Sequence, residues 1–417
     1  MDLAPLRERD FALLFTAGLI SLTGNWVLSV ALPLAVLGLT GSPAAVSVVV
    51  VASLLGTISA GAVAGVYVDR WDRRRVVVTV NVLQVVALLP LLLVRTADDV
   101  WIVVVVAFAT QALAQFFQPA ENALLPQLVD ATRLPAANAL NALNNNVARL
   151  VGPALGGVIA VAGGLAGAAV LDAATFAVAA VLCGLIRGRH RAEASDNRDL
   201  RRELLEGLRA VAHNRIVRAI FVIIAVSSVG EGMMGTLFAV YVTKALHAGG
   251  RELGWLMSAQ AVGGIIGSLA ATRITARFRP VPLITTCWTF FGVVDVIIFN
   301  YPRWDTTFWP VLALFVVVGI PVGIHVGAIW TLFQIETPDR LRGRAFSAIW
   351  LGASIASVVG AGIAGALGDR IDVLTLLTVQ GAGCVVAGLS FRLLAGKGPG
   401  SLVRPEPQPK AAEATAH

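Results

Sequence analysis

Long runs of apolar residues, separated by short polar connections, dominate this chain of 417 residues. A run of about 20 residues is what an α-helix needs to cross the hydrocarbon layer of a bilayer. In lipid, such a run satisfies its backbone hydrogen bonds only as a helix. The pattern predicts an all-α membrane protein with transmembrane helices at 11–39, 44–68, 76–95, 100–126, 136–162, 167–187, 217–243, 252–272, 281–300, 308–335, 345–368 and 373–395.

The longest polar interruption, from Arg187 to Arg218, divides these twelve segments into two groups of six. We expect an N-terminal six-helix bundle at 1–187, a cytoplasmic linker at 188–216, a C-terminal six-helix bundle at 217–396 and a disordered tail at 397–417. Apolar residues recur at helical spacing in the linker, which predicts an amphipathic helix on the inner membrane face: Leu200, Leu204, Leu205, Leu208 and Val211.

The two groups of segments also echo each other. Gly61 and Gly65 in the second segment match Gly263 and Gly267 in the eighth, and residues 152–157 of the fifth match 360–365 of the eleventh. Such duplication is typical of transporters that bind their substrate near the middle of the membrane, between two related halves.

Charge sets the orientation. The chain is 57% hydrophobic and only 14% charged, which excludes a soluble domain. Its net charge of +7 resides in the short connections rather than on a basic face, so we expect no nucleic-acid partner and contact with membrane lipid instead. One side of the membrane carries only Arg95, Lys244, Arg251, Arg303 and Arg370. The positive-inside rule places the other side, with both termini, in the cytoplasm. Arginine in preference to lysine, with the Ala/Val/Gly bias, indicates a bacterium with a GC-rich genome, so we expect the chain in a bacterial inner (plasma) membrane.

Several classes of site are missing from the sequence. The three cysteines, Cys183, Cys287 and Cys384, lie inside apolar runs without paired spacing, so we expect neither a disulfide nor a metal site. We find no His-Glu-x-x-His motif, nucleophile elbow or phosphate-binding loop. We therefore expect no enzyme activity, no cofactor and no hydrolysis of ATP by this chain.

The connection between the second and third segments is dense in charge, Gly65-Val66-Tyr67-Val68-Asp69-Arg70-Trp71-Asp72-Arg73-Arg74-Arg75. Its pattern Gly-x-x-x-Asp-Arg-x-x-Arg-Arg resembles the corresponding loop of the major facilitator superfamily. Residues 152–157, Gly-Pro-Ala-Leu-Gly-Gly, resemble the fifth-helix signature of antiporters in that superfamily, although Ala148 replaces a preceding glycine. The connections at 126–140 and 338–344 are similar to those of the drug:proton antiporter-like branch that holds macrolide-efflux and siderophore-export proteins.

The resemblance implies two pseudo-symmetric six-helix bundles that export an amphipathic small molecule in exchange for protons. We expect the carrier to be a monomer. For the signature of the fifth helix, the resemblance implies that Gly152, Gly156 and Gly157 allow close helix packing and that Pro153 bends the helix near the outer gate. It also implies a conformational latch of the outward-open state, in which Asp69 faces the start of the eleventh helix; its residues are Gly65, Asp69, Arg70, Arg73, Arg74 and Arg344. Two alternatives stay open: the fifth-helix glycines only pack helices together, or the chain is an uptake or uniport carrier of a small metabolite with the same fold.

Titratable side chains inside membrane segments are costly and mark candidate sites. Arg149 shares one face of the fifth segment with Asn145, and Glu231 in the seventh is the first candidate for its counter-ion. Glu231 either binds and releases a proton during transport or forms a permanent ion pair with Arg149. The further candidates for proton coupling are Glu121, Asp172 and His325, although a lone membrane histidine is more often a packing residue.

Polar and adaptable apolar side chains on the cavity-lining segments of this fold are candidate substrate contacts. Aromatic residues in membrane helices also face lipid, so we expect only some of these side chains to point inward. The candidates are Asn25, Trp26, Gln111, Gln115, Phe117, Asn145, Met234, Phe238 and Trp330.

Overall fold

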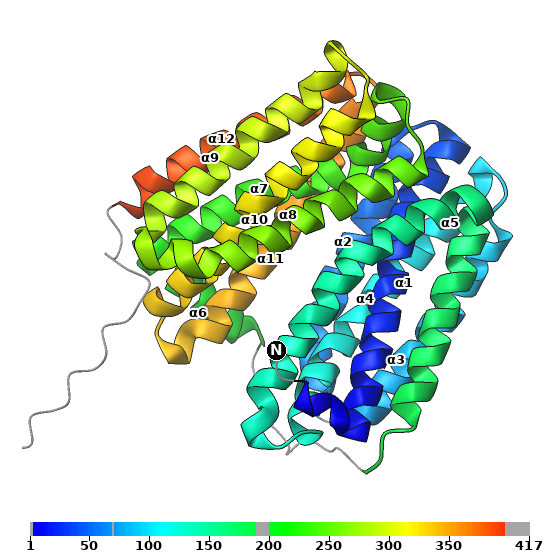
Figure 1. The fold of residues 1–417 in the computed structure, drawn as a ribbon, viewed down its shortest axis with the longest axis vertical. Helices are drawn as coiled ribbons and strands as arrows, with labels where there is room; N and C mark the ends of the chain where they lie inside the picture. The colour runs from blue at the N-terminus through cyan, green and yellow to red at the C-terminus, as the bar shows by residue number, and fades with distance from the viewer. Residues whose placement is uncertain (1–2, 69–70, 189–199, 397–417) are drawn as a thin grey trace, which may run out of the picture.

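The computed structural model describes residues 3–68, 71–188 and 200–396, which form helices joined by short connections, with no strand in these ranges (Figure 1). The α-helices are α1 (Arg9–Thr40), α2 (Pro43–Val68), α3 (Arg73–Leu88), α4 (Val100–Leu124), α5 (Leu134–Gly184), α6 (Leu200–His213), α7 (Arg215–Val240), α8 (Gly250–Arg277), α9 (Pro280–Asn300), α10 (Phe308–Glu336), α11 (Asp339–Gly368) and α12 (Val373–Ala395).

Local capping determines where several helices begin and end. Gly41 takes φ 67° and ends α1, and Pro43 starts α2 two residues later. The side chain of Asp72 accepts a hydrogen bond from the Arg75 amide at 3.0 Å and starts α3. Asn214 does the same for the first amides of α7. The short polar connections thus set the register of the apolar helices that follow them.

Within the described residues, eleven helices are long and apolar enough to span a bilayer, and because α5 bends back on itself they give twelve membrane crossings, the predicted number. The 51 residues of α5 would extend about 76 Å as one straight helix, more than twice the hydrocarbon thickness of a bilayer. The chain turns back at Gly164, whose φ of 59° and ψ of −156° suit glycine almost alone. The two arms, α5a (134–163) and α5b (165–184), are the predicted fifth and sixth segments.

The helices form two bundles (Figure 1). In the N-terminal bundle α1 packs on α5, α2 packs on α4, and α3 lies against both α4 and α5. In the C-terminal bundle α7 packs on α11 and α12, α8 packs on α10, and α9 lies against α10 and α12. The bundles meet mainly along two seams, α5 with α8 and α2 with α11. We call the side where α1 begins and α12 ends the termini side, and the other the opposite side.

Glycines in equivalent places bring helices together within the two bundles. A Cβ on Gly56 of α2 would collide with the Phe108 carbonyl of α4, and a Cβ on Gly263 of α8 would collide with the Val316 carbonyl of α10. Gly267, one turn after Gly263, also meets a carbonyl of α10, whereas a Cβ on Gly61 would lie 3.6 Å from the Gln115 side chain, so the match of Gly61 with Gly263 stays a prediction.

The predicted match between the fifth and eleventh segments agrees with their contacts. Gly152 of α5 packs on α1, and Gly360 of α11 packs on α7. Farther along each helix, Gly157 meets α8 and Gly365 meets α2, in each case across the boundary between the bundles. The α5–α8 seam and the α2–α11 seam are therefore equivalent features of the repeat.

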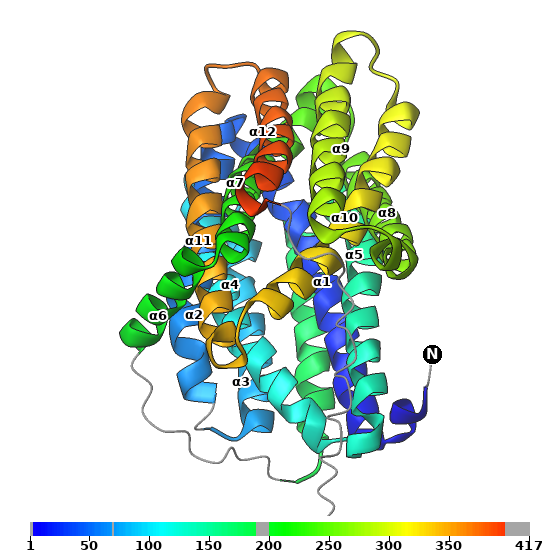
Figure 2. The same cartoon turned by 90° about the vertical axis from the view of Figure 1, so that its left-hand side faces the viewer.

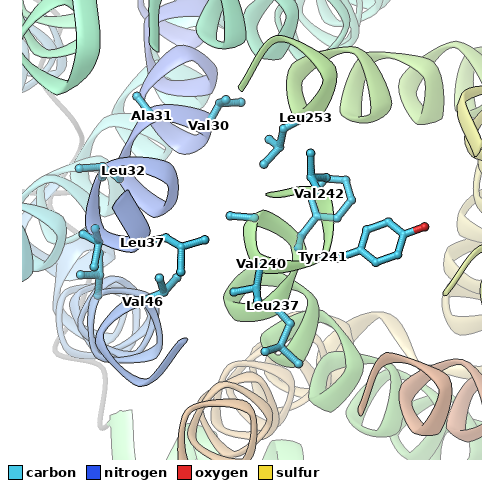
Figure 3. Close-up of a cluster of buried hydrophobic side chains, with 14 of the residues drawn as sticks. Val30, Ala31, Leu32, Leu37, Val46, Leu237, Val240, Tyr241, Val242 and Leu253 are labelled. Carbon is cyan, nitrogen blue, oxygen red and sulfur yellow. The ribbon is translucent and has the colours of Figure 1, made fainter. Parts of the chain in front are cut away.

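Apolar packing closes the opposite side of the molecule. One cluster of buried side chains takes in Leu37 and Val46 from the N-terminal bundle and Leu237 and Val240 from the C-terminal bundle, and Figure 3 shows these side chains next to one another. On the termini side the buried side chains form two separate clusters, one in each bundle. In the part of the chain that the structure describes, the bundles thus share a core on the opposite side and have separate cores on the termini side.

Hydrogen bonds across both seams reinforce this closure. Ser47 Oγ of α2 donates to the carbonyl of Ala361 on α11 at 2.6 Å. In the equivalent seam, Ser258 Oγ of α8 donates to the carbonyl of Leu150 on α5, also at 2.6 Å. The Ser47 hydroxyl is buried and the Ser258 hydroxyl is part-buried, and each bond supplies the partner that such a group needs.

A helix, α6, occupies the linker and lies beside the termini-side end of α11 (Figure 2). Val211 is buried against the C-terminal bundle, whereas Leu205 and Leu208 are exposed. A helix with one apolar strip on protein and another exposed suits the membrane interface. Residues 189–199 and the predicted disordered tail at 397–417 lie outside the described residues, and the division into four parts stays a prediction.

Candidate functional site

The polar stripe predicted on the fifth segment follows the termini-side half of α5. Asn145 and Arg149 are exposed, whereas Gly152 and Gly156, farther along the same face, are buried. The glycines lie against α1, where a Cβ on Gly156 would come within 2.9 Å of Val27 Cα. The stripe is therefore accessible where the bundles have separate cores and covered where they share one.

Pro153 and Gly157, the other residues of the antiporter-like signature, lie in the α5–α8 seam. The Pro153 carbonyl abuts Gly254, and a Cβ on Gly157 would collide with the Gly250 carbonyl. A side chain larger than hydrogen has no room at these glycines unless a backbone moves. The signature thus brings α5 into close contact with α1 on one face and with α8 of the other bundle on the next.

Arg149 of α5 and Glu231 of α7 belong to different bundles, and both are exposed near the middle of their membrane segments. Each charge acts electrostatically on the other. In the described part of the chain, no ion pair or hydrogen bond joins the two side chains. The predicted alternative of an ion pair between them is therefore absent from this conformation. A charge inside a membrane segment needs water or a charged partner. Arg149 and Glu231 are not held together by a direct bond, so each can exchange water for a partner when the bundles move.

The other two predicted acidic candidates are enclosed in the N-terminal bundle. Glu121 of α4 is buried, and a Cβ on Gly18 of α1 would lie 3.2 Å from its Oε1. Asp172 of α5b is fully buried and accepts a hydrogen bond from Thr175 Oγ1 at 3.2 Å. Neither carboxyl pairs with Arg149 among the residues described here. Of the predicted carboxyls, Glu231 is the one that interacts with this arginine.

His325 of α10 is 7% exposed. Its Nδ1 lies 2.8 Å from the carbonyl oxygen of Pro321, one turn earlier, and its ring centroid is 4.7 Å from that of Trp288 on α9. The imidazole is thus held inside the C-terminal bundle, which suits the packing role.

The predicted substrate contacts differ in exposure. Phe238 is buried, with its ring centroid 5.5 Å from that of Phe315, and so belongs to the core that the bundles share. The polar candidates Asn25, Gln111 and Asn145 are exposed. Trp26, Gln115, Phe117, Met234 and Trp330 are half-buried.

Trp330 lies beside two aromatic residues that the sequence analysis did not single out. Its ring centroid is 5.1 Å from that of Phe346 and 6.2 Å from that of Trp350, which is 51% exposed. Trp350 shares a face of α11 with Ala361 and Gly365, which pack on α2 in the seam. The face that carries Trp350 is therefore directed toward the N-terminal bundle. We call Trp330, Phe346 and Trp350 the aromatic surface; the helical spacing from 350 to 361 and 365 was the signal that could have found it.

Two arginines of the predicted latch hold the ends of helices. Arg73 donates to the Ala123 carbonyl at 2.9 Å near the end of α4. Arg74 donates to the Gly184 carbonyl at the end of α5. Carbonyls in the last turn of a helix have no partner within that helix, and a cation there also meets the negative end of the helix dipole. These arginines therefore stabilise the termini side of the N-terminal bundle.

Arg344 of α11, the predicted receiving end of the latch, forms an ion pair with Glu206 of α6. Gly65 belongs to α2, whereas Asp69 and Arg70 lie outside the described residues. In this conformation the linker helix holds Arg344, and the latch itself stays a prediction.

A separate cavity of about 180 Å³ lies on the opposite side between α1, α5 and α8. Ala31, Leu34, Ala160 and Gly164 contribute to its apolar wall. It has no titratable side chain and is therefore no proton site. Among the described residues, no group of three His, Cys, Asp or Glu side chains could hold a metal ion.

Comparison with known proteins agrees with this architecture. The model of the transmembrane secretion effector family matches residues 1–398. The chain is 30% identical over 382 residues to the multidrug efflux pump Tap of Mycobacterium tuberculosis, covering 87% of this chain and 88% of the relative. It is 26% identical over 405 residues to the enterobactin exporter EntS of Salmonella typhi, covering 93% and 92%.

A solved structure has the same fold. A bacterial homologue of the iron transporter ferroportin in its inward-facing state superposes with a TM-score of 0.75 over 95% of this chain and 100% of its own, at 18% identity. The predicted fold, superfamily and absence of enzyme activity are confirmed. This chain is a multi-pass membrane transporter of the transmembrane secretion effector family, within the major facilitator superfamily.

Proposed function

We propose that the chain exports an amphipathic small molecule in exchange for protons, by alternating access between two rocking bundles. The observation that carries the proposal is the pair of opposite charges, Arg149 and Glu231, which are exposed on helices of different bundles and act electrostatically on each other without direct contact. A carboxyl favours its charged form beside a cation and its neutral form when it is desolvated. Motion that changes the distance between the bundles would therefore change whether Glu231 holds a proton.

The termini side is cytoplasmic in this proposal, in the inner membrane of a bacterial cell, because the arginine-rich connections lie there. The shared core on the opposite side and the separate cores on the termini side then describe an inward-facing carrier. Exposed polar groups such as Asn25, Gln111 and Asn145 would meet substrate that enters from the cytoplasm.

The aromatic surface supports an amphipathic substrate with a flat apolar part. Its three rings lie within 5.1 to 6.2 Å of one another, and Trp350 is half-exposed. Aromatic rings offer a large contact area at little conformational cost. The two relatives, a multidrug efflux pump and an enterobactin exporter, favour export over uptake.

The conformational cycle also needs a device that holds the other state. We propose that in the outward-open state the inner end of α11 leaves Glu206 and meets the Asp69 connection. Substrate is released and a proton is bound while the carrier is in that state. In this scheme two bundles move relative to each other, one at 1–187 and the other at 217–396. The linker at 188–216 connects them, the tail at 397–417 follows, and the carrier works as a monomer.

The test is transport of a fluorescent amphipathic dye into inverted membrane vesicles with an imposed proton gradient. The parent protein should accumulate dye when the lumen is acidic, and Glu231→Gln should abolish accumulation without changing expression or melting temperature. Asp98→Asn, an exposed carboxyl on the opposite side, is the matched control and should behave as the parent. Gradient-independent equilibration by the parent would establish a uniport carrier, and an unaffected Glu231→Gln variant would remove this residue from coupling and shift attention to Glu121, Asp172 and His325.

A further inference from the structure

A second carboxyl lies close to Glu231 inside the C-terminal bundle. Asp295 of α9 is 6% exposed, and its hydrogen-bond partner is Gln380 Nε2 of α12 at 3.3 Å. No arginine, lysine or histidine pairs with Asp295 in the described part of the chain. Burying a carboxylate without a cation is far more costly than burying the neutral acid, so these surroundings favour an acid that holds its proton.

Gln380 connects this carboxyl to the helix that carries Glu231. A Cβ on Gly230 would lie 3.0 Å from Gln380 Cγ and 3.2 Å from its Nε2, so the amide lies directly against α7, at the residue before Glu231. Both carboxyls also act electrostatically on Cys384, whose Sγ is 3.7 Å from the same Nε2. Glu231 and Asp295 therefore flank one buried polar group.

One atom of this group lacks a partner. Gln380 Oε1 is buried and makes no hydrogen bond. A carboxylate has no proton to give it, whereas a protonated Asp295 can donate to Oε1 once the amide turns by 180° and exchanges its oxygen and nitrogen. The amide thus has two arrangements, one that suits the carboxylate and one that suits the acid.

The other titratable groups near Asp295 are engaged elsewhere. Tyr241, which packs on α9, donates its hydroxyl to the Ile298 carbonyl at 2.8 Å. His325 of α10 faces Trp288, two turns along α9 from Asp295. None of them supplies a permanent positive charge, so Gln380 and Glu231 are the groups to which Asp295 can respond.

We propose that Asp295 is a second proton-binding site, linked to Glu231 through Gln380. The proposal rests on the antiport function above and deepens it, because the C-terminal bundle would bind a proton on an exposed carboxyl and another on a buried one. Movement of α7 presses or releases Gln380 at Gly230 and so changes whether the amide offers Asp295 a donor or an acceptor. Each of the two carboxyls then binds and releases one proton in each conformational cycle.

The experiment compares Asp295→Asn with the parent protein in reconstituted vesicles. Asparagine keeps a hydrogen bond to Gln380 and cannot titrate, so we expect an unchanged melting temperature and retained substrate counterflow. Gradient-driven accumulation should be lower than in the parent, with one fewer proton exchanged per substrate. Asp372→Asn, an exposed carboxylate just before α12, is the matched control and should retain coupling. If Asp295→Asn unfolds, Gln380→Leu removes the link instead and should lower the number of protons exchanged per substrate in the same way.

A second readout does not depend on transport. Dicyclohexylcarbodiimide reacts with protonated carboxyls in apolar surroundings, and peptide mass spectrometry should locate its adduct on Asp295 of the parent. Asp295→Asn that keeps the parent's proton stoichiometry, or a parent that is never labelled there, would overturn the second site. If Glu231→Gln also keeps full coupling, the proposed antiport site fails as well, so the two failures are distinguishable.

Discussion

Gly157 in the α5–α8 seam offers a direct way to shift the balance between the two conformations. A Cβ at this position would collide with the Gly250 carbonyl and come within 2.9 Å of Arg251 Cα, both in the other bundle. Gly157→Ala therefore strains the conformation in which the opposite side is closed. When that side opens, the seam parts and the methyl group has room, so the strain acts on one state alone.

The size of the effect follows from general packing energetics. Forcing an extra methyl into a well-packed contact costs about 1 to 3 kcal/mol. That range changes the ratio of the two conformations by about 5- to 150-fold, in favour of the state that is open on the opposite side. Alanine also raises helix propensity by about 1 kcal/mol over glycine, but this gain is equal in both states and cancels.

Cysteine accessibility measures this ratio. The native cysteines are buried, so introduced cysteines report on their own surroundings. Ser47→Cys lies buried in the α2–α11 seam and should react faster with a water-soluble maleimide in the Gly157→Ala background. Ser347→Cys is exposed on the termini-side half of α11 and should react more slowly there, because closure of that side covers it.

Two other glycines provide the controls. Gly163 has no atom within 4 Å of a built Cβ, so Gly163→Ala should leave both labelling rates unchanged. Gly360 meets the Val229 carbonyl within its own bundle, so Gly360→Ala should lower the melting temperature without opposite changes at the two reporters. Equal labelling rates in Gly157→Ala and the parent, with both proteins folded, would refute the assignment of this seam as a gate.

Three further predictions concern the aromatic surface, the linker and an outer loop. Trp350→Ala should weaken binding of an aromatic substrate about fivefold, since one ring contact contributes about 1 kcal/mol; tryptophan quenching measures this, with the exposed Trp309→Ala as control. Glu206→Gln breaks the half-exposed ion pair between α6 and α11 and should lower the unfolding free energy by less than about 1 kcal/mol, a difference that high salt removes in a thermal melt. The hydroxyl of Thr307 donates to Asp305 and holds the pKa of that carboxyl below its usual 3.8. The ionised carboxyl therefore stabilises the folded state fully above pH 3.8, and this stabilisation is lost as the pH falls through the lowered pKa. The melting temperature of the parent should fall over that acid range, and Asp305→Asn should remove this contribution to the fall.

The number of crossings could be predicted from the sequence because it depends on local physics. An apolar run in lipid must be a helix, and the glycines around Gly164 supply the only sharp turn that the long α5 needs. Register between helices is different. Small residues recur about every helical turn, and such a pattern does not say which turn meets the neighbouring helix; on α2 it is Gly56, not Gly61, whose Cβ would collide with a carbonyl of α4.

The candidate site shows the same limit. The sequence offered several acidic partners for Arg149, and burial separates them: Glu121 and Asp172 are enclosed by α1, whereas Glu231 is exposed and coupled to the arginine. That distinction depends on which face of each helix meets its neighbour. Trp350 was missed for the same reason, because its direction follows from the packing of α11 on α2.

Both bundles contain a glycine on their first helix that packs on a buried polar side chain and is followed by an exposed polar residue. The bundles differ in which of these two polar residues is the acid. In the N-terminal bundle the exposed residue on the first helix is the amide Asn25, and the glycine before it packs on the buried carboxyl of Asp172. In the C-terminal bundle the exposed residue is the carboxyl of Glu231, and the glycine before it packs on the buried amide of Gln380. The repeat thus exchanges the positions of acid and amide while keeping the backbone contact. Because Arg149 belongs to the N-terminal bundle, this exchange puts the exposed carboxyl on the opposite bundle, where relative motion of the bundles changes the interaction between the two charges.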